Sequence, residues 1–142
     1  MSEKNLANEI SKGGYQVTNE VSKENFPVVP GITPGIPMIV EIVDEILEKG
    51  KIVFATETIA SMGCRMANIW DFFDFRSNHP NVEVNGLLVL GEGEYNLVIQ
   101  KISGGQYLLN GDHRNNRSWN CASSAGGYVI RAGKFLVVKP VS

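Results

Sequence analysis

The sequence has few cysteines, no excess of positive charge and no long apolar run. Its two cysteines, Cys64 and Cys121, lie far apart without CxxC or Cys/His spacing, which argues against a zinc site and a disulfide framework. A reduced, cytoplasmic setting is therefore expected. Thirteen Lys and Arg oppose fifteen Asp and Glu, so direct nucleic-acid binding is not expected. The longest apolar stretches, of about ten residues, are too short for a membrane span or a secretory signal.

The length of 142 residues predicts one domain with a tail. Residues 1–25 are polar and show little apolar periodicity, which is typical of an extended arm. The next segment, FPVVPGITPGIP (26–37), contains four prolines that remove backbone donors and favour an extended chain. We therefore predict a polar arm and proline-rich strap over residues 1–37 and a single β-rich domain over residues 38–142.

Apolar periodicity changes along the chain. Apolar residues recur every three or four positions from Ile39 to Lys49, and Gly50 follows as a C-cap, so one short amphipathic helix is predicted there. After Gly50 the period becomes two. The predicted strands are KIVFATETI (51–59), NIWDFFDF (68–75), VEVNGLLVL (82–90), EYNLVIQKI (94–102), QYLLN (106–110), GYVIR (127–131) and KFLVVK (134–139). This pattern predicts a mainly β fold, a small antiparallel sandwich or partly rolled barrel with one short helix and an extended N-terminal arm.

A series of short motifs follows the proline-rich strap in a fixed order. Ser61 and Met62 stand after the first predicted strand, and Asp71 comes ten residues after the serine. Asn85 and Gly86 then open a strand, an acidic turn and a second strand that leads to a lysine. In this order the motifs resemble the LexA/UmuD-like family of self-cleaving serine-lysine peptidases over residues 24 to 139. The whole length is similar to a UmuD-like protein without a DNA-binding domain.

The resemblance implies a Ser-Lys dyad. Ser61 would attack a peptide bond within residues 24–36 of its own chain, and Lys101 would take and return the proton. Backbone N–H groups near Met62 would stabilise the oxyanion, with Asp71 as a supporting residue. Neither a metal nor an organic cofactor is implied.

The register of the lysine strand decides whether this dyad can exist. A lysine acts as a base only where burial leaves its amine neutral. The family pattern places either Lys101 or Gln100 in the catalytic position, and neighbouring strand residues face opposite sides of a sheet. Gln100 facing Ser61 would make the chain a catalytically degenerate member.

Self-association is a further expectation. Trp70, Phe72, Phe73 and Phe75 would occupy both faces of the predicted strand 68–75, so one face is predicted to fill the core and the other to meet a second copy. A strand edge is predicted to take part in the same contact. The family resemblance implies a cytoplasmic homodimer in the DNA-damage (SOS) response or in phage repression. Its implied partners are a translesion polymerase and a recombinase filament.

Two other function classes suit the same sequence. A polar arm, a proline-rich strap and a compact β body are typical of a viral or phage structural protein, such as a capsid decoration or tail component. Such a protein would lie in the virion against capsid or tail neighbours. The remaining hypothesis is a nucleotide-binding module that uses the loop 111–124 and the arginines Arg114, Arg117 and Arg131.

Overall fold

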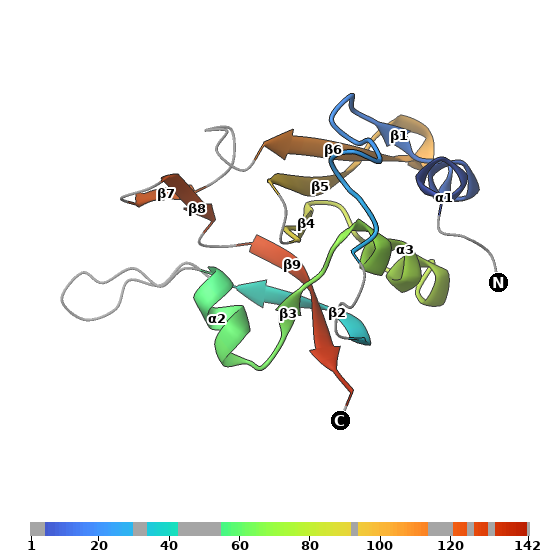
Figure 1. The fold of residues 1–142 in the computed structure, drawn as a ribbon. Coiled ribbons are helices and arrows are strands. Elements are labelled where there is room, and N and C mark those ends of the chain that lie inside the picture. Colours follow the sequence, from blue (N-terminus) through green and yellow to red (C-terminus); the bar gives the residue numbers. More distant parts are fainter. Residues whose placement is uncertain are drawn as a thin grey trace.

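The computed structural model describes residues 5–29, 34–42, 55–91, 94–113, 121–124, 127–130 and 133–141 (Figure 1). Its helices are α1 (Leu6–Gly13), α2 (Ala55–Ser61) and α3 (Ile69–Asn78), and Ser103–Gly105 form a short 3-10 turn. The strands are β1 (Gln16–Val17), β2 (Gly35–Ile42), β3 (Arg65–Met66), β4 (Leu87–Val89), β5 (Tyr95–Lys101), β6 (Tyr107–His113), β7 (Cys121–Ser124), β8 (Gly127–Ile130) and β9 (Gly133–Pro140). The prediction of a mainly β fold is confirmed.

Within these ranges, one sheet of seven strands carries the fold (Figure 1). Its order is β1-β6-β5-β4-β9-β2, and β3 pairs with the second half of β9. The β1–β6 and β4–β9 pairs are parallel, so the sheet is mixed and not wholly antiparallel as predicted. It is open, because β1 and β2 stand at its two ends. β7 and β8 form a separate hairpin.

Each face of the sheet carries its own hydrophobic cluster. In β5, Leu97 and Ile99 belong to a cluster with α1 and α3, whereas Val98 packs against a cluster that contains Ile59 of α2. This alternation follows from the period of two of strand side chains. The α3 face and the α2 face are the names used below for these two sides of the sheet.

Helix α3 supplies most of the large side chains on the α3 face. Trp70, Phe72, Phe73 and Phe75 are all buried, with at most 6% of their surface exposed. Complete burial of each such side chain stabilises the fold by about 1.5–3 kcal/mol. The α3 face is therefore the main core of the domain.

A capping box starts α3. The Asn68 side chain accepts a hydrogen bond from the Asp71 N–H at 3.0 Å, and the Asp71 carboxylate accepts one from the Asn68 N–H at 2.9 Å. These bonds satisfy N–H groups that have no partner inside the helix. The polar pair thereby determines where the aromatic helix begins.

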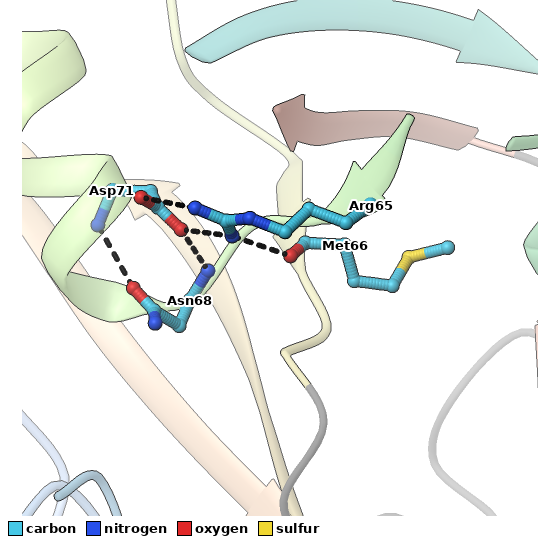
Figure 2. Close-up of polar contacts among 4 residues, drawn as sticks. All are labelled: Arg65, Met66, Asn68 and Asp71. Atoms are coloured by element: carbon cyan, nitrogen blue, oxygen red, sulfur yellow. Dashed lines mark hydrogen bonds and ion pairs between the residues drawn. The ribbon is translucent and has the colours of Figure 1, made fainter. Parts of the chain in front are cut away.

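An ion pair ties this helix start to the sheet (Figure 2). Both guanidinium nitrogens of Arg65 in β3 donate to the Asp71 carboxylate, at 2.8 and 3.3 Å, and Arg65 also donates to the Met66 carbonyl at 3.1 Å. The two side chains are 16% and 14% exposed, so water screens the pair only in part. The arrangement fixes α3 directly beside the strand that precedes it.

The prediction of a helix over residues 39–49 is wrong for residues 39–42. Residues Ile39–Ile42 belong to β2, which pairs with β9 along its whole length. The three- and four-residue spacing also fits a strand with apolar side chains on both faces, and the branched Ile and Val residues favour a strand. Residues 43–50 lie outside the described residues.

Two predicted strands are helices. Ala55–Ser61, within and just after the predicted strand 51–59, forms α2, and the predicted strand 68–75 lies almost entirely in α3. In NIWDFFDF the apolar residues at 69, 70, 72 and 73 follow helical spacing, and the capping box supplies the helix start. Because the aromatic side chains all enter one core, the predicted aromatic face for a second copy is absent.

The N-terminal segment packs on the domain. The arm (1–25) and the start of the strap (26–37) are predicted to be extended, but residues 6–26 contain α1 and β1 and place Leu6, Val21 and Phe26 in the core of the α3 face. β1 joins the sheet beside β6. The apolar residues of this segment are too sparse to show a clear period in the sequence. They nevertheless hold the segment on the domain, because they join the core cluster formed by α3 and the sheet.

Five predicted strands are confirmed as β4, β5, β6, β8 and β9. In β5 and β6 the pairing runs without interruption from Tyr95 opposite His113 to Lys101 opposite Tyr107. Local alternation and a short connecting turn were enough to place these strands.

Asp71→Ala should lower the free energy of unfolding by about 2 kcal/mol, because it removes the carboxylate that accepts the Asn68 N–H in the capping box and leaves Arg65 without its ion-pair partner. Urea denaturation measures the change. Asp74→Ala is the matched control, since Asp74 is an exposed acid on the same helix. Equal stability of the two variants would contradict this role for Asp71.

Candidate functional site

Ser61 stands at the C-terminal end of α2 and not at a strand end. Its hydroxyl donates a hydrogen bond to the Thr58 carbonyl at 2.7 Å. The Met62 N–H, predicted as an oxyanion donor, donates to the carbonyls of Thr58 and Ile59, both at 3.1 Å. A carbonyl cannot act as a base, so these contacts stabilise the helix end and do not activate the serine.

Lys101 and Gln100 end β5 on different faces of the sheet. Lys101 shares the face of Ile99, which is the α3 face, and Gln100 shares the face of Val98, which is the α2 face. The Lys101 side chain is 50% exposed and its ammonium lies 3.8 Å from the Glu83 carboxylate. Gln100 accepts a hydrogen bond from the Asn110 amide at 3.1 Å. The structure therefore does not bring Lys101 to the face on which α2 packs.

A polar network holds Lys101 where it is. The Glu83 carboxylate accepts hydrogen bonds from the Asn85 N–H at 2.9 Å and from the Tyr107 hydroxyl at 2.8 Å. These bonds, with the N–H of Asn85 as the larger cause, hold the pKa of Glu83 below its ordinary value. Partial burial, followed by the bond to Glu83, raises the pKa of Tyr107. The Arg76 guanidinium lies 5.5 Å from the centre of the Tyr107 ring. This exposed network holds the chain around Glu83 and Asn85 against the ends of β5 and β6. It does not bury the Lys101 amine, which would be needed for a lysine to act as a base.

The other predicted site residues have structural contacts or lie outside the described residues. Asp71 caps α3 and pairs with Arg65, as described above. In the segment predicted to be cut, Phe26 is buried, and residues 30–33 lie outside the described residues. Arg114, Arg117 and Arg131 of the nucleotide-binding hypothesis also lie outside them. Among the described residues, no three His, Cys, Asp or Glu side chains gather as a metal site.

A strand edge was expected from the sequence to meet a second copy, but which strand offers it was not predicted, and among the described residues the structure leaves one edge of β2 free. In the described part of the sheet, β2 is an end strand that pairs with β9 on one side. The Leu136 carbonyl accepts the Ala67 N–H, so Leu136 in β9 points its backbone groups away from β2. Ile39 lies opposite Leu136 and therefore points its own N–H and carbonyl to the free edge.

The alternation of an antiparallel strand extends this result along β2. Gly35, Pro37, Ile39 and Glu41 direct their backbone groups outward, and the residues between them bond to β9. Pro37 fits this pattern because a proline in a strand turns its missing donor toward an open edge. The edge thus presents N–H donors at Gly35, Ile39 and Glu41, and carbonyl acceptors at these three residues and at Pro37.

Side chains near this edge are apolar and partly accessible. Ile36 is 62% exposed, Met38, Ile39 and Val40 are half-buried, and Glu41 is exposed. A strand edge with unpaired backbone groups and accessible apolar side chains is a site for pairing with another strand. A proline two residues after the strand start was the available signal, since prolines within sheets occur on edge strands.

Comparison of the chain with protein-family models, curated proteins and solved structures gave no match. No described helix has the length and apolar character needed to cross a membrane. The functional argument therefore depends on the geometry of the chain itself.

At alkaline pH, where a lysine base is neutral, we expect the full-length chain to stay intact. The reason is that the Ser61 hydroxyl donates to a carbonyl and Lys101 lies on the other face of the sheet. Intact mass spectrometry over time measures this, with Ser61→Ala as the control. A cut within residues 24–36 that disappears in Ser61→Ala would establish the Ser-Lys dyad.

The lowered pKa of Glu83 can be tested through the Tyr107 hydroxyl, and it predicts how this carboxyl contributes to stability as the pH changes. A carboxyl whose pKa is lowered by folding stabilises the protein above its unfolded pKa, and this contribution is lost as pH falls through the lowered value. Tyr107→Phe removes a donor and should raise the pKa of Glu83 toward 4.5. NMR titration of the carboxyl carbon measures the shift. Tyr95→Phe should leave it unchanged, and an unmoved Glu83 in Tyr107→Phe would contradict the assignment.

Proposed function

We propose that this chain is a non-catalytic assembly module that forms a homodimer by pairing the free edge of β2 with the same edge of a second copy. The observation that supports the proposal is the outward direction of the backbone groups of Ile39 and Glu41. Two identical edges pair antiparallel about a two-fold axis, so the outward N–H groups of Ile39 and Glu41 in one copy can meet outward carbonyls of the other. The seven-stranded sheet would then continue across both copies.

Pro37 distinguishes two registers of this pairing. If the axis passes at Val40, Ile39 of one copy lies opposite Glu41 of the other, and both residues exchange their hydrogen bonds. An axis at Met38 would place Pro37 opposite Ile39 and lose a donor on each copy. The register at Val40 keeps Pro37 outside the bonded pairs and brings the half-buried Val40 side chains together.

Self-association is common to both leading hypotheses from the sequence. A dimerising domain of the DNA-damage response and a subunit of a viral assembly each need a surface for a second copy, and neither role needs a live serine. The contacts of Ser61, Lys101 and Gln100 favour a role in which the protein assembles but does not cleave itself. We therefore include in this proposal that the chain is a LexA/UmuD-like protein whose Ser-Lys site is inactive.

The edge is tested by removing one outward N–H. Glu41→Pro removes such a donor without taking a side chain from the core, because Glu41 is exposed. Light scattering after size exclusion should give twice the 15.6 kDa of one chain for the wild type and one chain for Glu41→Pro. Glu41→Thr is the matched control, since it changes the same side chain, keeps the N–H and should stay dimeric. A wild-type monomer, or a dimeric Glu41→Pro, would contradict the proposal.

The register is tested by cross-linking. Opposed residues of a pair without mutual hydrogen bonds have Cα atoms about 4.5 Å apart, within reach of a disulfide. In a background with Cys64 and Cys121 replaced by alanine, Val40→Cys should form a covalent dimer on mild oxidation. Met38→Cys should not, because in this register Met38 lies opposite residue 42 of the other copy. The reverse result would place the axis at Met38.

A further inference from the structure

A cavity of about 590 Å³ lies between α1, the segment 21–28 and α3. None of its described lining residues belongs to β2. Its lining residues are Asn5, Leu6, Ala7 and Ile10 of α1 and its cap, Val21, Lys23, Phe26, Pro27 and Val28 of the following segment, and Trp70 of α3. Cavities of this size accept small organic molecules.

The inner wall of the cavity is apolar and held in place. Leu6, Val21, Phe26 and Trp70 are each at most 9% exposed. The Trp70 indole N–H donates to the Pro27 carbonyl at 3.3 Å, so its one polar group is already bonded and the rest of the ring is apolar. This bond also fixes the segment 21–28 against α3. The wall therefore suits an apolar chain or ring and is formed before any ligand arrives.

The rim of the cavity carries charge of one sign. Lys23 is the charged residue among the described lining residues, its side chain is exposed, and no acid lines the cavity with it. The Asn5 side-chain oxygen Oδ1 already accepts the Asn8 N–H at 3.1 Å. An ammonium beside an apolar wall complements a molecule with an apolar body and one negative group.

We infer that this cavity binds a small amphipathic carboxylic acid, with its apolar body against Trp70 and Phe26 and its carboxylate beside Lys23. The carboxylate stays at the rim, where water still reaches it, so no charge has to be buried without a partner. The apolar body replaces water along the wall and supplies most of the affinity.

Dodecanoate below its micelle concentration is the probe. Trp119→Phe leaves Trp70 as the remaining tryptophan, and its fluorescence should change in a saturable way on titration. Calorimetry on the wild-type protein gives the same constant without any substitution. Dodecyltrimethylammonium, with the same chain and the opposite charge, should bind at least fivefold more weakly. Equal binding of the two probes, or no saturation in either measurement, would overturn the inference.

Variants locate the site. Lys23→Gln should weaken dodecanoate binding by about threefold to fivefold, as expected for an exposed charge pair. Lys12→Gln changes a lysine outside the lining and should not weaken it.

Ala7→Phe should abolish binding, because it adds a ring to an exposed lining position without altering the core. Normal dodecanoate binding by Ala7→Phe would contradict the inference. If this variant also has a different oligomeric mass from the wild type, the cavity holds part of a second copy instead of a small ligand. Glu41→Pro should bind dodecanoate as the wild type does, which separates this site from the proposed dimer.

Discussion

The bidentate ion pair between Arg65 and Asp71 is the contact on which the rest of the fold depends. It joins a strand of only two residues, β3, to the start of α3, and the capping box with Asn68 fixes the first turn of that helix. This junction fixes the start of the helix whose aromatic side chains pack over the sheet. The polar contacts are few, but they direct an apolar burial that is several times larger in free energy.

The same short segment also sets the geometry of the β2 edge. Ala67, between β3 and the cap residue Asn68, donates its N–H to Leu136 in the central strand β9. That bond decides which residues of β9 face β3 and β4 and which face β2. The direction of the backbone groups of Ile39 therefore follows from a contact on the opposite side of β9. The capping of an internal helix and the direction of the β2 edge are parts of one arrangement.

The sequence predicts the elements that local patterns determine. The strands of the β5–β6 hairpin alternate regularly and are joined by a short turn, so neighbouring residues suffice to place them. The helix α3 was predictable as well from Asn68 and Asp71, three residues apart at the start of an apolar run. β2 was not, because its state depends on pairing with β9 near the other end of the chain. For the Ser-Lys hypothesis, alternation showed that Lys101 and Gln100 must face opposite sides, but only the sheet shows which helix covers each side.

The two ends of the sheet differ in a way that limits assembly. β1 is two residues long and offers little backbone to a second chain, which is a common protection of sheet edges. β2 is eight residues long, but Pro37 removes a donor from one half of its outward row and the exposed Glu41 charge disfavours random contact. In the proposed pairing, one usable edge that pairs with itself would give a closed dimer, because each copy would then have no second strand edge of comparable length among its described residues. A sheet with two such edges would grow into a fibre, so the short β1 and the proline in β2 together favour a defined particle.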